Sequence, residues 1–159
     1  MQTIVLHAFA HGGFVHLALN AAALVVLGGP LISQLGRPPM AWFRFAYLFT
    51  GSVVCGAILF LLFNRDDHAV LIGASGGLFG ILGALARVNP MTGESVPVYS
   101  TRTLQLVRFF IVNHAALFLL VVAFAFAFGS FAMVAWEAHL GGLLFGFLAA
   151  TFYLKSPGG

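Results

Sequence analysis

Long apolar runs separated by short polar connections dominate the chain. An α-helix rises about 1.5 Å per residue, so a run of about 20 apolar residues is long enough to cross the hydrocarbon core of a bilayer. The pattern therefore predicts an all-α fold, a polytopic membrane bundle of about five transmembrane helices. The expected ranges are Phe14–Leu35, Ala41–Phe63, Ala69–Ala86, Leu106–Phe128 and Trp136–Leu154.

The composition agrees with this pattern. Hydrophobic residues make up 61% of the 159 positions and charged residues only 7%, and the mean hydropathy is +1.04. A soluble fold of this size has too little interior to bury so much apolar surface. We therefore predict an integral, multi-pass membrane protein surrounded by the lipid bilayer. Residues 1–159 are expected to form a single transmembrane domain.

The basic residues indicate the orientation in the membrane. Cytoplasmic connections retain Lys and Arg, and only Arg65 lies in the second connection. The first and third connections and the C-terminus are therefore expected inside and the N-terminus outside. The basic residues form no cluster, so we expect no nucleic-acid partner. The other six basic residues are Arg37, Arg44, Arg87, Arg102, Arg108 and Lys155.

The N-terminal residues lack the basic and apolar regions of a signal peptide. An N-terminus outside the membrane and an odd number of helices both suggest that a first transmembrane helix precedes this sequence in the natural protein. We therefore expect the domain to be incomplete at its N-terminal end.

Two polar side chains lie within the apolar runs and carry the candidate chemistry. Ser75 lies in Gly73-Ala74-Ser75-Gly76, and His139 begins the last run. At the helical rise, Ser75 lies about 18 Å above Arg87 and His139 about 24 Å above Lys155, which places both in the outer half of the bilayer. A serine and a histidine at similar depth on neighbouring helices can act as nucleophile and general base.

Small residues allow the two helices to approach closely. Gly76 and Gly80 form one stripe, and Gly142 and Gly146 form a GxxxG step with His139 on nearly the same face. We expect these glycines to form the contact between the two helices.

A second polar group lies near the N-terminus. His16 and Asn20 are four residues apart and project from one helical face. Together with the backbone N–H of Ser75, their N–H groups are suitable donors to a developing oxyanion. His7 and His11 have the same spacing and either bind a metal or support the outer end of the bundle.

These motifs resemble the rhomboid family of intramembrane serine proteases, in the family's order and spacing. The blocks are His11-x4-His16-x3-Asn20 with Leu27-Gly28-Gly29, then Gly73-Ala74-Ser75-Gly76-Gly77-Leu78-Phe79-Gly80, then Ala138-His139-Leu140-Gly141-Gly142-x3-Gly146.

The resemblance implies a catalytic dyad of Ser75 and His139 without an aspartate. It implies an oxyanion hole of His16, Asn20 and the Ser75 amide, and Phe79 as the aromatic next to the imidazole. It also implies cleavage of single-span membrane proteins near the outer end of their helices, with water and neither cofactor nor metal. Two departures are the absent first helix of the six-helix core and Ile32-Ser33-Gln34 where charged residues are common.

Access to such a site is expected from the side and from outside. A substrate helix would enter past the fourth segment, beneath a lid formed by the loop Gly129–Ala135 with Phe131 and Met133. The expected location is a bacterial inner membrane, with the active site open to the outer side. The fourth segment offers the apolar face Phe109, Phe110, Phe118, Phe124, Phe126 and Phe128.

Other interpretations remain open. A catalytically silent relative would keep the fold and only bind transmembrane helices. A transporter would use the histidines as ligands or relays, but the four carboxylates all fall outside the apolar runs or at their ends. Ser75 and His139 themselves could serve only as structural hydrogen-bonding groups. His114 and Cys55, each in the middle of a segment, are expected to be packing residues, the former hydrogen-bonded.

Overall fold

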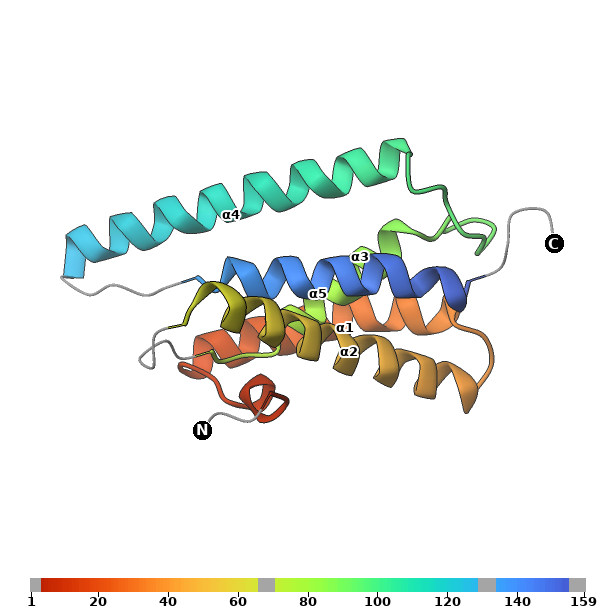
Figure 1. Ribbon diagram of the computed structural model, residues 1–159, viewed down its shortest axis with the longest axis horizontal. Coiled ribbons are helices and arrows are strands. Elements are labelled where there is room, and N and C mark those ends of the chain that lie inside the picture. The colour runs from red at the N-terminus through yellow and green to blue at the C-terminus, as the bar shows by residue number, and fades with distance from the viewer. Residues whose placement is uncertain (1–3, 66–70, 129–133, 155–159) are drawn as a thin grey trace.

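The computed structural model describes residues 4–65, 71–128 and 134–154. Five α-helices form a bundle in these residues, which confirms the predicted all-α membrane fold (Figure 1). A 3-10 turn, Leu6–Phe9, precedes the first helix, and another, Ala150–Phe152, follows the last. The helices are α1 (Phe14–Gln34), α2 (Met40–Phe63), α3 (Ser75–Ala86), α4 (Thr101–Phe128) and α5 (Trp136–Ala149).

Helices α2, α3 and α5 form the centre of the bundle, and α1 packs on α3 and α2. Helix α4 lies to one side of this group (Figure 1). The largest core cluster joins α1, α2, α3 and the end of α5, and its most buried side chains have no exposed surface. Close packing of apolar side chains from four elements fixes their relative positions. These side chains include Leu31, Leu35, Leu48 and Ile81.

Helices α1, α2 and α4 are long and apolar enough to cross a membrane. The two helices that carry the candidate dyad are shorter than expected, at 12 residues for α3 and 14 for α5. A membrane helix that is shielded by longer neighbours does not need to span the hydrocarbon by itself, because its ends meet protein rather than lipid.

The predicted helix Ala69–Ala86 is wrong at its start, because α3 begins at Ser75. Gly73 adopts a φ of +102°, which interrupts a right-handed helix and favours glycine. The N–H of Gly73 donates to the carbonyl of His7 at 2.9 Å instead of to a carbonyl one turn back. Ser75 is consequently the first residue of a helix and not an interior one.

Helix α4 begins at Thr101, earlier than the expected Leu106. The Ser100 hydroxyl accepts a hydrogen bond from the N–H of Thr103 at 3.2 Å, which satisfies a donor at the start of the helix. Most of α4 faces away from the other helices: the exposed fractions of Phe109, Phe118 and Phe126 are 50%, 65% and 89%. An apolar helix exposed in this way suits contact with lipid.

The glycines of α3 and α5 lie at the contact between the two helices. A Cβ added at Gly142 would overlap the carbonyl oxygen of Gly76, and one at Gly146 would overlap that of Gly80. At Gly76 the nearest atom to an added Cβ would be the Ala138 carbonyl oxygen at 3.2 Å. The two backbones therefore touch without intervening side chains, as small-residue steps allow.

Several expectations fall partly or wholly outside the described residues. Of the loop Gly129–Ala135, only Val134 and Ala135 are described, so the lid stays a prediction. The side chains of Phe124 and Phe128 and the residue Lys155 also lie outside the described part of the chain.

Candidate active site

Ser75 and His139 are brought together by the packing of α3 against α5. The Nε2 atom of His139 lies 2.8 Å from the Ser75 hydroxyl oxygen, which is hydrogen-bonding distance. The His139 side chain is 8% exposed and that of Ser75 is half-buried. This is the contact that a serine nucleophile and its general base require.

The ring of Phe79 stacks on the imidazole of His139. Their centroids are 4.4 Å apart and the planes are inclined by 24°. Phe79 follows Ser75 by four residues on α3, so one helical turn places the ring beside the serine and beneath the histidine. The stacking limits the rotation of the imidazole.

The second nitrogen of His139 contacts a third residue, which the sequence did not single out for the site. His139 Nδ1 lies 2.8 Å from His114 Nε2, and His114 Nδ1 lies 2.8 Å from the carbonyl oxygen of Phe110. A hydrogen-bonding role was expected for His114, but not contact with His139. The depth of His114 in the membrane could have indicated this contact. His114 is twelve residues beyond Arg102, which corresponds to about 18 Å at the helical rise, and Ser75 is the same distance from Arg87.

Glu137 does not take part in this chain of hydrogen bonds. Its carboxylate accepts a hydrogen bond from the Asn64 amide at 3.3 Å, which joins the start of α5 to the end of α2. Two residues along a helix correspond to about 200°, so Glu137 and His139 face different sides of α5.

His16 and Asn20 project from α1 toward the segment that precedes Ser75. A Cβ added at Gly73 would lie 2.8 Å from His16 Cε1 and 3.8 Å from Asn20 Nδ2. His16 Nδ1 accepts a hydrogen bond from the Gly12 N–H at 3.4 Å, which leaves the proton of the neutral ring on Nε2, the nitrogen that faces Gly73. Asn20 is buried and donates one N–H to the His16 carbonyl at 3.0 Å.

The start of α3 supplies further donors. The first N–H groups of an α-helix have no acceptor within the helix, and they carry its positive partial charge. Ser75 is the first residue of α3, so its own N–H belongs to this group. One N–H of Asn20 and the Nε2–H of His16 also remain to donate toward the same region. The structure does not bring either side chain into hydrogen bonding with Ser75 itself.

The other N-terminal histidines lie around this group. His7 is buried and holds the Gly73 segment through its carbonyl. His11 bonds through Nδ1 to the Phe9 carbonyl at 3.1 Å, and its ring meets that of His16 edge to face at 5.4 Å. Within the described ranges, no three side chains of His, Cys, Asp or Glu gather as metal ligands would.

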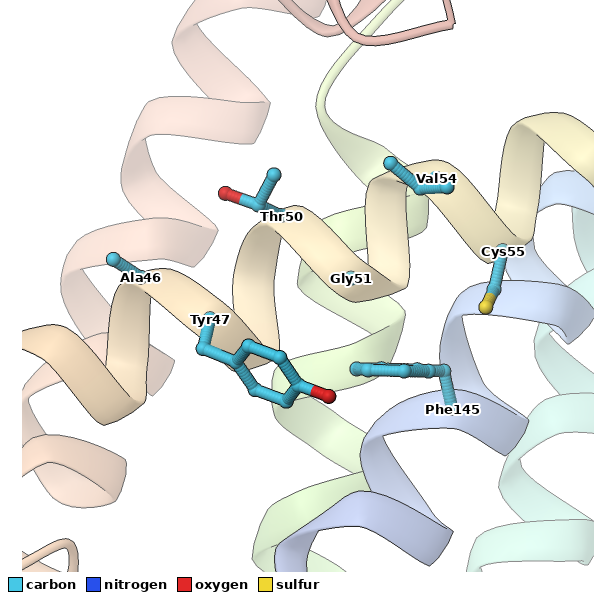
Figure 2. Close-up of a pocket in the computed structure, with 7 residues that line it drawn as sticks. All are labelled: Ala46, Tyr47, Thr50, Gly51, Val54, Cys55 and Phe145. Atoms are coloured by element: carbon cyan, nitrogen blue, oxygen red, sulfur yellow. The ribbon is translucent and has the colours of Figure 1, made fainter.

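A surface groove lies elsewhere, between α2 and α5 (Figure 2). Its volume is about 510 Å³, and Tyr47 and Phe145 face one another across it. Cys55, which was expected to be a packing residue, is a half-buried free thiol at its edge. The groove is mostly apolar and contains none of the dyad residues. Its lining is Ala46, Tyr47, Thr50, Gly51, Val54, Cys55 and Phe145.

The arrangement is suited to acyl transfer. It combines a serine hydroxyl, an imidazole in contact with it, and N–H donors at the start of α3. In a water-poor interior such donors act more strongly than they would in water.

Comparisons with known proteins agree with the sequence resemblance. A family model of the rhomboid domain matches residues 1–156. The chain is 29% identical over 150 residues to RHOMBOID-like protein 5 of Arabidopsis thaliana and 28% identical to the mitochondrial Rhomboid protein 1 of Saccharomyces cerevisiae. It is 31% identical over 141 residues to Rhomboid protease GluP of Bacillus subtilis.

These alignments cover 92%, 97% and 89% of this chain, respectively. They cover 42%, 42% and 24% of the relatives, so the chain spans less than half the length of each. No solved structure matches the chain.

Proposed function

The chain belongs to the rhomboid family, and from that premise we propose that it is an intramembrane serine endopeptidase that uses Ser75 and His139 as its dyad. The observation that carries the proposal is the 2.8 Å contact between His139 Nε2 and the Ser75 hydroxyl oxygen inside a membrane helix bundle. Ionisable groups are costly in an apolar membrane interior, so a buried imidazole in contact with a serine supports a functional role.

The first half of the reaction forms an acyl-enzyme. The Ser75 oxygen attacks the carbonyl carbon of the scissile peptide while His139 Nε2 accepts the hydroxyl proton. The negative charge then forming on the carbonyl oxygen is met by N–H groups of Ser75, His16 and Asn20. As the C–N bond breaks, His139 returns the proton to the leaving amine.

The second half of the reaction consumes one water molecule. His139 removes a proton from the water, whose oxygen attacks the acyl carbon, and the Ser75 oxygen leaves and recovers the proton from His139. The products are a new carboxyl end, a new amino end and the original enzyme. Both halves of the reaction use only groups of the protein and water, so the proposal includes no cofactor or metal.

The proposed substrates are single-span membrane proteins cut near the outer end of their transmembrane helices. Helix α4 supports lateral entry, because its apolar side chains are exposed and it lies to one side of the central helices (Figure 1). For the location, the chain is a multi-pass membrane protein, and we propose a bacterial inner membrane with the site open to the outer side. In this proposal residues 1–159 form one transmembrane domain.

The test is labelling of the purified chain in detergent with a fluorophosphonate probe, which reacts with activated serines. We expect labelling of the wild-type chain and its loss, by at least about 10³-fold in rate, in Ser75→Ala and His139→Ala. Ser33→Ala is the matched control, because Ser33 is exposed and bonds only to the Pro30 carbonyl at 2.8 Å.

Circular dichroism of each variant shows whether the helices are intact. If the folded wild-type chain does not label, or if Ser75→Ala labels like wild type, the enzyme proposal is wrong. The chain would then be a catalytically silent rhomboid-like protein that binds transmembrane helices, and binding of a single-span helix to the detergent-solubilised chain would test that.

A further inference from the structure

The hydrogen bonds around His139 continue onto α4 and end at a backbone carbonyl. They connect the Ser75 hydroxyl with His139, His139 with His114, and His114 with the Phe110 carbonyl, each across 2.8 Å. Three different helices contribute: α3 the serine, α5 the first histidine and α4 the second.

The terminal carbonyl determines the direction of every bond in this chain. A carbonyl oxygen only accepts hydrogen bonds, so His114 Nδ1 carries a proton and His114 Nε2, in the neutral ring, is an acceptor. His139 Nδ1 must then donate to it, which leaves the lone pair of His139 on Nε2. That lone pair faces the Ser75 hydroxyl, and this is the tautomer that a general base requires.

Aromatic contacts hold both imidazoles in place. The Phe79 ring lies 4.4 Å from the His139 ring and 5.3 Å from the His114 ring, centroid to centroid. On α4 itself, the Phe110 ring lies 4.0 Å from that of His114 and 5.7 Å from that of Phe79. The two histidines are therefore confined in orientation as well as linked by a hydrogen bond.

We propose that His114 is the positioning residue of the site, which fixes the tautomer and orientation of His139 through the bond to its Nδ1 atom. This inference rests on the proposed dyad and extends it. A buried acid performs this role in Ser-His-Asp triads. No Asp or Glu contacts His139 among the described residues, and the one carboxylate nearby in sequence, Glu137, bonds to Asn64.

A neutral acceptor is sufficient for the role. When His139 takes the serine proton, its Nδ1–H becomes part of a cation, and a hydrogen bond from a cation is stronger than one between neutral groups. His114 accepts that bond without the need to bury a permanent negative charge in the membrane interior, which would be costly.

The position of His114 also makes the site depend on α4. Helix α4 contacts the central helices through Leu106, which packs with Leu143 and Phe147 of α5, and through Phe110 beside Phe79. If α4 moves outward, His139 loses its partner. The site is then complete only while α4 is docked.

Three substitutions at His114 separate the hydrogen bond from other effects. In His114→Gln the side-chain oxygen reaches the position of Nε2 and can accept from His139. In His114→Asn the oxygen reaches only the position of Nδ1, and in His114→Leu there is no acceptor. We expect the maximal labelling rate with the fluorophosphonate probe to fall about 10- to 100-fold in His114→Asn and His114→Leu, as for other orienting partners. The half-saturating probe concentration should not change, and His114→Gln should retain most of the rate.

The proposal would be overturned if wild type and the three His114 variants had equal labelling rates. It would also be overturned if all three variants lost the same fraction of the wild-type rate. The second outcome would mean that only the ring of His114 matters for packing. Thermal unfolding in detergent identifies any variant that does not fold, and the comparison of His114→Gln with His114→Asn uses two side chains of the same polarity.

The positioning role of His114 can also be tested without a measurement of enzyme activity. Nitrogen NMR of ¹⁵N-histidine-labelled protein, with His139 assigned from His139→Ala, reports which ring nitrogen carries the proton. We expect the Nδ1–H form in wild type and in His114→Gln. In His114→Leu the Nε2–H form should grow, because a buried Nδ1–H without an acceptor is costly.

Different results would reject the enzyme proposal and the positioning role of His114. An unlabelled wild-type chain with the Nδ1–H form of His139 would reject the enzyme and keep the positioning role. A labelled chain whose His139 shows the same tautomer and the same labelling rate in wild type and His114→Leu would keep the enzyme and reject the positioning role.

Discussion

At the scale of single residues, Gly73 is the position where two requirements meet. Its φ of +102° is one that side chains rarely adopt, and the His16 ring occupies the space that a Cβ would need. The backbone turn ends the preceding segment and allows α3 to begin at Ser75. The missing side chain lets the His16 imidazole lie beside the start of the helix. One residue thus connects the proposed nucleophile with the proposed oxyanion donors.

We predict that Gly73→Ala strongly reduces fluorophosphonate labelling while the protein still folds. The added methyl group would lie 2.8 Å from His16 Cε1 and push the ring away from the site. Backbone strain at this φ adds a cost of about 1–3 kcal/mol. Labelling rate and thermal unfolding in detergent, measured on the same preparation, report the two effects separately.

Gly13→Ala is the matched control for this prediction. Gly13 also has a positive φ, of +146°, but a Cβ there would meet no atom within 4 Å. It should lower stability and leave the labelling rate near that of wild type. If both variants label equally, displacement of His16 does not matter for the site.

At the scale of the helices, the two short elements α3 and α5 carry the proposed dyad, and the three long ones are α1, α2 and α4. Helices α3 and α5 touch backbone to backbone at Gly76–Gly142 and Gly80–Gly146. This close contact sets both their separation and their register. A shift of one residue along either helix is 1.5 Å, which is enough to lengthen a 2.8 Å hydrogen bond beyond its useful range.

We predict that Gly146→Ala destabilises the bundle by about 1–3 kcal/mol, the usual cost of an overpacked contact. The added Cβ would overlap the carbonyl oxygen of Gly80, which is backbone and cannot rotate away. The helices must separate, so labelling of Ser75 should fall together with the unfolding temperature.

Gly29→Ala tests whether the effect comes from that contact. Gly29 lies within α1, and a Cβ there would meet nothing within 4 Å. Alanine is a better helix former than glycine, so this variant should be as stable as wild type or slightly more stable. A loss of stability equal to that of Gly146→Ala would show that the proposed contact is not the cause.

At the scale of the whole molecule, the ends of the helices separate two faces. Helices α1, α3 and α5 begin at the end of the bundle where α2 and α4 finish, on the left in Figure 1. The proposed dyad lies toward that end, since Ser75 begins α3 and His139 is in the first turn of α5. The connection between α3 and α4 lies at the other end, with the buried Arg87 beside it.

We predict that a membrane-impermeant maleimide labels Phe9→Cys in intact bacterial cells and Met91→Cys only after permeabilisation. The two positions are 76% and 93% exposed, so both thiols would be accessible to the reagent. Cys55→Ala removes the background thiol. The reverse pattern would place the dyad at the cytoplasmic end and contradict the positive-inside argument.

The amino-acid sequence alone determined the class and much of the site. Apolar runs of membrane length predicted the five helices, because the cost of exposing polar backbone to lipid leaves few alternatives. Helix starts and ends follow local composition, so α1 and α2 match the predicted ranges within one residue at each end. Depth along a helix is also a local property, which is why Ser75 and His139 were expected at similar levels.

Only the tertiary structure decided where α3 begins and which residue contacts the Nδ1 atom of His139. The start of α3 depends on Gly73, whose N–H bonds to a carbonyl 66 residues earlier, at His7. The contact of His114 with His139 depends on how α4 docks against α5, and no local pattern specifies the rotation of one apolar helix against another. Such contacts are set by side-chain packing between helices, which a single sequence does not display.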